Sequence, residues 1–103
     1  MAGRLPEKVL DIIKHIPVGK VMMYGQIAKL AGSLRVARQF VRILHSMSRK
    51  YNLPWHRVVN TKGEIVIKDE NKVLVQTISL ENEGVKVINH KVDLRLYQQH
   101  PLN

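Results

Sequence analysis

The sequence predicts a mainly α fold with short β strands (α+β), arranged as a winged-helix-like domain that contains a helix-turn-helix. Two predicted helices separated by a Gly32-Ser33 turn match the helix-turn-helix pattern, and brief apolar runs after Gly63 can form a wing beside it. The 103 residues, 45% of them apolar, suffice for one modest core. We therefore expect a single domain over residues 1–103, with a docked tail beyond about residue 89 that frays at Pro101.

The first three helices are predicted from apolar residues at helical spacing. The first runs from Leu5 to Ile16 and ends at Pro17, because proline cannot continue a helix. After a turn and a short strand or connection over 21–23, a second helix runs from Tyr24 to Ala31, with Gly32 at the left-handed position after its end. A third extends from about Leu34 to Met47, with Ser33 as its N-cap.

The second half of the chain is predicted to supply the wing and one more helix. A strand is expected over Glu64–Ile67 after Gly63. Residues 68–71 then lead into a helix that continues through about Glu83 and ends at Gly84, and a short strand follows over Val85–Ile88.

The charge of the chain indicates a polyanionic partner. Seventeen Lys and Arg residues against eight Asp and Glu give a formal charge of +9. Nucleic acid is favoured over an anionic membrane, because no apolar run approaches the ~18 residues that span a bilayer. We expect no membrane association and a cytoplasmic, nucleoid-associated protein, or a nuclear one in a eukaryote. The chain has no cysteine, which excludes disulfides, thiolate metal sites and a cysteine nucleophile.

The predicted third helix has one apolar face and one basic face. Its basic residues recur at intervals of three and four and share a narrow sector of the helix: Arg35, Arg38, Arg42, His45 and Arg49. A solvated charged face usually mixes signs, whereas residues 34–49 contain no Asp or Glu. The pattern favours contact with nucleic-acid phosphates.

Three blocks at matching spacing resemble the DNA-binding domain of the O6-alkylguanine-DNA alkyltransferases. They are Ile16-Pro17-Val18-Gly19-Lys20-Val21 with Tyr24-Gly25-Gln26-Ile27-Ala28-Lys29-Leu30-Ala31-Gly32, then Ala37-Arg38, then Pro54-Trp55-His56-Arg57-Val58-Val59. In that family, a cysteine before His-Arg-Val takes the alkyl group from guanine O6, which requires an activated thiolate. Trp55 stands at that position, and an indole offers no comparable nucleophile. Trp in place of Cys is typical of the alkyltransferase-like branch; the alternative is that Trp55 is an ordinary core aromatic.

The resemblance also implies roles for individual residues. Arg38 is the finger that fills the base stack when a nucleotide is rotated out, and the recognition helix enters the minor groove. Tyr24, Trp55 and Lys68 line the lesion pocket, although Tyr24 could equally be a core tyrosine. Lysine at 68, where relatives tend to have arginine, lacks a planar stacking surface, so we expect weaker lesion discrimination. The remaining implied residues are the DNA-contacting Arg35, Ala37, Gln39, Arg42 and Arg49, and the former active-site motif Pro54, His56, Arg57 and Val58, retained mostly for hydrogen bonding and folding.

The expected function is therefore recognition without chemistry. The protein would bind double-stranded DNA containing O6-alkylguanine, flip the lesion into a pocket without transferring the alkyl group, and mark it for nucleotide-excision-repair proteins. We expect a monomer with no catalytic residue, metal or cofactor. The alternatives are a winged-helix transcription regulator, a nonspecific architectural DNA-binding protein, and an enzyme that transfers the alkyl group to another residue or excises the base.

Overall fold

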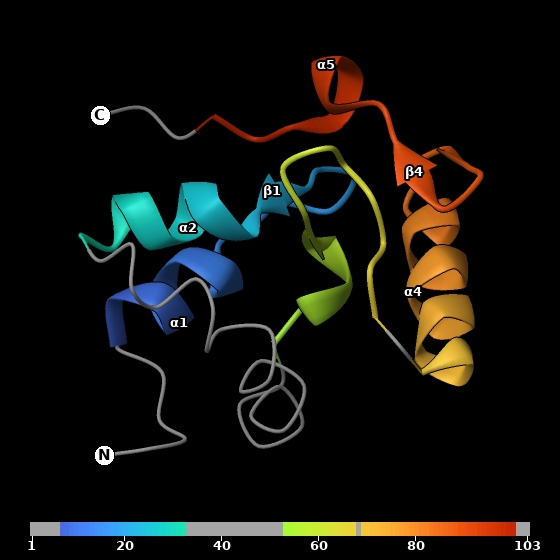
Figure 1. Cartoon of the computed structure of the whole chain (residues 1–103). Helices are drawn as coiled ribbons and strands as arrows, with labels where there is room; N and C mark the ends of the chain where they lie inside the picture. The colour runs from blue at the N-terminus through green and yellow to red at the C-terminus, as the bar shows by residue number, and fades with distance from the viewer. Residues whose placement is uncertain (1–6, 33–52, 68, 101–103) are drawn as a thin grey trace.

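The computed structural model describes residues 7–32, 53–67 and 69–100. Two helices, α1 (Glu7–Lys14) and α2 (Tyr24–Leu30), pack together on one side of the molecule, and α4 (Glu70–Asn82) stands on the other (Figure 1). Between them lie the two-residue strands β1 (Met22–Met23) and β2 (Val58–Val59). The mixture of helices with short strands agrees with the predicted α+β class. The predicted third helix, 34–47, and with it the second half of the helix-turn-helix, falls outside the described residues.

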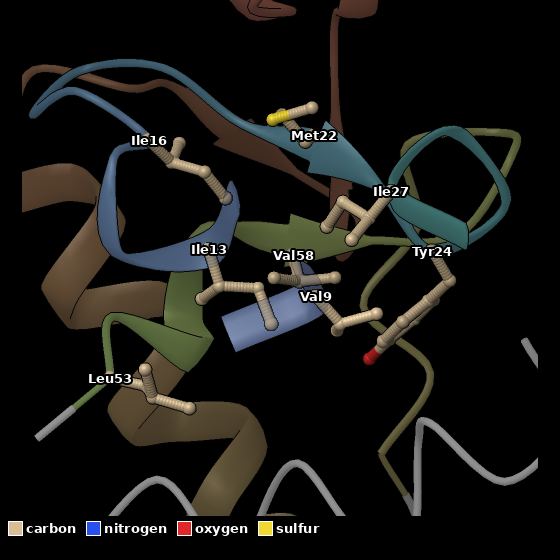
Figure 2. Packing of buried hydrophobic residues seen from close by; sticks show 8 residues of the cluster. All are labelled: Val9, Ile13, Ile16, Met22, Tyr24, Ile27, Leu53 and Val58. Carbon is tan, nitrogen blue, oxygen red and sulfur yellow. The ribbon is translucent and has the colours of Figure 1, made fainter. Parts of the chain in front are cut away.

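The β1–β2 pair divides the interior into two apolar clusters. The strands are parallel, with Met22 opposite Val58 and Met23 opposite Val59. Because successive strand side chains point to opposite faces, Met22 and Val58 enter one cluster while Val21 and Val59 enter the other. The first cluster, drawn in Figure 2, comprises Val9, Ile13, Ile16, Met22, Tyr24, Ile27, Leu53 and Val58. The second comprises Val21, Val59, Ile65, Leu80, Val85 and Val92.

The first two helices form close to where their apolar spacing predicts. α1 buries Val9 and Ile13, four residues apart, but ends at Lys14, two residues before the predicted end. The cause is a tighter turn, in which the Ile16 N–H donates to the Ile13 carbonyl at 3.1 Å, three residues back. α2 begins at Tyr24 as predicted, and Gly32 has the expected left-handed φ of 83°.

Helix α4 is confirmed, together with its predicted end at Gly84. Asp69 caps its N-terminus by accepting a hydrogen bond from the Asn71 N–H at 2.9 Å. At the other end Gly84 has a φ of 88°, and the Val85 N–H donates to the Leu80 carbonyl at 3.0 Å. This is the glycine-terminated helix end that the Glu83-Gly84 pair predicts.

The predicted strand Glu64–Ile67 is wrong. Within this segment only Glu64 makes a β-bridge, to Lys91. The side chain of Asn60 instead organises a tight turn, because its Oδ1 accepts hydrogen bonds from the N–H groups of Lys62, at 2.9 Å, and Glu64, at 2.7 Å. The apolar run after this turn is therefore joined to the wing only locally, by the bridge at Glu64 and by the Ile65 N–H, which donates to the His90 carbonyl at 2.9 Å.

The wing is a minimal hairpin of β3 (Val87–Ile88) and β4 (Lys91–Val92). The strand predicted over Val85–Ile88 is thus confirmed for its second half only. Asn89 and His90 both have positive φ, 51° and 59°, which is the backbone of the two-residue turn that suits twisted hairpins. Sequence reasoning did not predict β4.

The tail beyond the wing docks on β1. The short helix α5 (Leu94–Tyr97) follows β4, after which the chain runs across the top of β1 and α2 in Figure 1. The Val21 N–H donates to the Tyr97 carbonyl and the Gln99 N–H to the Val21 carbonyl, each at 2.8 Å. This confirms the predicted docked extension. Among the helices of the described segments, none has the length and apolarity to cross a membrane.

Candidate functional site

The Pro-Trp-His-Arg-Val block forms a compact turn between the two clusters. Pro54 caps the 3-10 helix η1 (Trp55–Arg57), and the Arg57 N–H donates to the Pro54 carbonyl at 3.0 Å. Val58 then enters β2 and is buried. Trp55 is half-buried, with part of its indole packed against the first cluster. The turn thus keeps Trp55 partly exposed to solvent and leads directly into the buried Val58.

Glu83, at the end of α4, holds both charged side chains of the turn. Its two carboxylate oxygens accept from Arg57, with Nε to Oε1 at 2.9 Å and Nη2 to Oε2 at 2.7 Å. His56 Nε2 lies 2.8 Å from the same Oε2, so this nitrogen must carry the proton, because a carboxylate can only accept. The third guanidinium nitrogen of Arg57 donates to the Ile16 carbonyl at 2.8 Å. The forked pair therefore ties η1 to both α4 and the end of α1.

The electrostatics of Glu83 follow from these contacts. Burial alone would raise the pKa of Glu83, but hydrogen bonds from Arg57 and His56 outweigh it and lower that pKa from 4.5 to about 2. The carboxylate is consequently ionised at neutral pH, with its accepting capacity directed at the turn. His56 is already engaged by this carboxylate, an arrangement that suits structural support.

Gln76, also on α4, contacts the backbone of the same turn. Its side chain is buried, and Nε2 donates to the carbonyls of His56 and Val58, each at 3.0 Å. Helix α4 therefore holds the turn at two points: Gln76 binds its backbone carbonyls, and Glu83 binds the side chains of His56 and Arg57.

Tyr24 lies in the first cluster at the start of α2. Its residue is only 8% exposed, and Figure 2 shows it at the edge of that cluster. Burial raises the pKa of its hydroxyl to about 12, so the group remains a neutral hydrogen-bonding phenol at physiological pH. Tyr24 is thus a member of the first cluster, and its role in lining a lesion pocket stays a prediction.

The structure brings together one part of the predicted site. Trp55, Tyr24 and Val58 contact the same cluster, and His56 and Arg57 share Glu83. The other predicted site residues lie outside the described segments: Arg35, Ala37, Arg38, Gln39, Arg42, Arg49 and Lys68.

Two residues that support the turn were not predicted. Glu83 was interpreted only as the end of a helix, and Gln76 was not distinguished from its neighbours. The Glu83-Gly84 pair predicts where α4 ends, but it does not indicate which side chains Glu83 contacts. Over the three described segments, no group of three or more His, Asp or Glu side chains is placed to hold a metal ion.

The fold and the turn define a class of protein. Residues 4–85 match the family described as "6-O-methylguanine DNA methyltransferase, DNA binding domain", and the chain belongs to this family. Within it, the chain is similar to a bacterial and a yeast protein. It is 42% identical over 94 residues to the "DNA base-flipping protein" of Escherichia coli K12, a match covering 90% of this chain and 72% of that protein. It is 35% identical to "Alkyltransferase-like protein 1" of Schizosaccharomyces pombe, with 91% and 93% of the two chains covered.

A solved structure supports the same relationship. The crystal structure of S. pombe Atl1 in complex with damaged DNA containing O6-carboxymethylguanine matches this fold with a TM-score of 0.83 and 35% identity, over 92% of this chain and 94% of the other. The predicted fold class and the family resemblance are thereby confirmed.

Proposed function

We propose that this protein binds duplex DNA containing O6-alkylguanine and holds the lesion without removing its alkyl group. The observation that carries the proposal is Trp55 in the Pro-Trp-His-Arg-Val turn of a chain that has no cysteine. The turn is otherwise held in place by hydrogen bonds, because His56 and Arg57 both contact Glu83. The names of the relatives, and the damaged DNA in the S. pombe complex, agree with this role.

Chemistry at position 55 explains why binding would not proceed to repair. Alkyl transfer needs a polarisable lone pair placed to attack the alkyl carbon, which a thiolate supplies and an indole does not. His56 is hydrogen-bonded to Glu83, and with no thiol beside it a general base has nothing to activate. The partly exposed indole of Trp55 would instead stack on a base that has been rotated out of the duplex.

The other residues in the proposed mechanism bind the DNA backbone, fill the gap left by the flipped nucleotide or contact the flipped base. The basic residues Arg35, Arg42 and Arg49 contact phosphates, which supplies affinity without sequence preference. Arg38 fills the stack left by the rotated nucleotide. Lys68 supplies a cation near the flipped base, and its lack of a planar surface limits the selectivity for the alkylated form.

The proposal is tested by titrating the protein against two duplexes that differ only in O6-methylguanine against guanine, using fluorescence anisotropy at near-physiological salt. We expect the modified duplex to bind at least about tenfold tighter, a difference of ~1.4 kcal/mol. Equal affinities would reduce the protein to a basic DNA-binding domain and contradict lesion recognition.

We further propose that the bound complex marks the lesion for nucleotide-excision repair, since binding alone removes nothing. In a reconstituted incision assay, addition of the protein should increase incision beside O6-methylguanine but not beside a lesion that the protein does not bind. Inhibition of incision would indicate that the protein shields the lesion instead.

A further inference from the structure

Gln76 is a buried polar residue that hydrogen-bonds to the backbone of η1. The residue is 1% exposed, at the interface between α4 and η1. Its Nε2 donates one proton to the His56 carbonyl and one to the Val58 carbonyl, both at 3.0 Å. These two carbonyls bracket Arg57, the last residue of η1, where the backbone changes from a tight turn to a strand.

The orientation of this amide is fixed by its neighbours. Both groups facing it are carbonyl acceptors, so only the NH2 end can satisfy them, and a flipped amide would set oxygen against oxygen. The other end, Oε1, is buried and has no hydrogen-bond partner among the described residues. A leucine or methionine would fill a similar volume without an unpaired acceptor of its own, but it would donate nothing to the two carbonyls, so the two donated hydrogen bonds are the feature that distinguishes glutamine here.

The two hydrogen bonds from Gln76 act together with those of Glu83, which lies seven residues further along the chain. Seven residues are close to two helical turns, so Gln76 and Glu83 lie on nearly the same face of α4. Gln76 holds the backbone of the turn, whereas Glu83 holds the side chains of His56 and Arg57. Gln76 therefore adds to the hydrogen bonds within η1, because it fixes the carbonyls of His56 and Val58 and with them the backbone that carries the Trp55 indole.

We propose that Gln76 is a positioning residue that sets the orientation of Trp55 through the backbone of η1, and thereby determines how well the protein discriminates alkylated from normal guanine. The statement about discrimination rests on the proposed function, whereas the statement about orientation does not. Gln76 itself is buried behind the turn and acts through Trp55.

The test compares Gln76→Met, which keeps the volume and removes both donors, with Val92→Ala as a control. Val92 is equally buried but belongs to the second cluster, away from η1. Because Trp55 is the only tryptophan in the chain, its emission maximum and its quenching by acrylamide report on the turn directly in the free protein. Thermal unfolding of both variants establishes that each is folded and how far each is destabilised.

We expect Gln76→Met to change the emission and quenching of Trp55 and to reduce the ratio of affinities for O6-methylguanine and guanine duplexes by about threefold or more. Val92→Ala should leave both readouts at the wild-type values despite a comparable loss of thermal stability. Wild-type emission in Gln76→Met, or the same change in Val92→Ala, would overturn the positioning role. If the wild-type protein shows no lesion preference, the proposed function fails, while the emission of free Gln76→Met still decides whether Gln76 orients Trp55.

Discussion

In the proposed function, Trp55 is the residue that separates recognition from repair. Sequence comparison with the alkyltransferase motif was sufficient to single it out, because the flanking Pro54, His56 and Arg57 keep the motif intact. The supporting residues were not predictable in the same way. Glu83 lies 26 and 27 residues from its two partners and Gln76 lies 18 and 20 residues from its own, and no local pattern in the sequence links them.

Replacing Trp55 with leucine should remove most of the lesion preference. Leucine keeps an apolar side chain against the first cluster but offers no aromatic face for a flipped base, and stacking contributes ~1–3 kcal/mol per base. Affinity for the O6-methylguanine duplex should therefore fall roughly tenfold. Binding to the unmodified duplex, which depends on phosphate contacts, should change by less than about twofold. Anisotropy titrations of both duplexes measure this, and an equal fall for both would argue against a stacking role.

The ion pair at Glu83 should make stability depend on acid pH. The pKa of this carboxyl is lowered from 4.5 to about 2, so the folded state binds the proton less readily than the unfolded state. Its contribution is fully present above pH 4.5 and is lost as pH falls towards about 2, with a magnitude on the order of 3 kcal/mol. Urea unfolding of the wild-type protein across this window should show the loss.

Glu83→Gln should flatten that pH dependence. It should also lower stability by roughly 2 kcal/mol at pH 7, because the Arg57 guanidinium loses its charged partner. Asp11→Asn is the matched control, since the Asp11–His15 pair is exposed and contributes little. A Glu83→Gln variant that keeps the wild-type loss between pH 4.5 and 2 would contradict this assignment.

At the scale of the elements, helices were predictable and very short strands were not. The helices α1 and α2 carry apolar spacing, whereas α4 is marked by recognisable end residues such as Asp69 and Gly84. β2 has only two residues, and its parallel pairing with β1 depends on a partner strand 36 positions away. A period of two cannot be seen over so short a run, which is also why the apolar segment after Gly63 was wrongly interpreted as a strand.

The packing of the β3–β4 wing should require glycine at position 63. Its φ is 78°, and a Cβ at this position would lie 2.4 Å from the Val92 carbonyl oxygen, so alanine would be both strained and in collision with backbone. Gly84 has a similar φ of 88° but no atom within 4 Å of the added Cβ, which makes Gly84→Ala a control for conformational strain alone. We expect Gly84→Ala to cost about 1 kcal/mol and Gly63→Ala at least about 1 kcal/mol more, measured by chemical unfolding. Equal losses would show that the wing can shift to accommodate the new side chain.

For the whole molecule, net charge and lesion selectivity should be separable. The formal charge of +9 predicts affinity for any duplex, with counterion release making that affinity fall steeply as salt increases. In the proposed function, lesion selectivity comes from stacking on Trp55, which releases no counterions. Between about 50 and 200 mM salt, both affinities should therefore fall by a factor of ten or more, while their ratio stays within about twofold. A ratio that collapses with salt would place the selectivity in the basic surface instead.

The central claim is recognition of O6-alkylguanine without transfer of its alkyl group, and one mass measurement tests both parts. The protein is mixed with equal amounts of an O6-methylguanine duplex and a guanine duplex of distinguishable length, and the complexes are weighed by native mass spectrometry before and after denaturation. The account predicts that the complex contains mainly the modified duplex and that protein and DNA are released with unchanged masses. A protein heavier by one methyl group, with the DNA lighter by the same amount, would show that the chain is a repair enzyme and contradict the role assigned to Trp55.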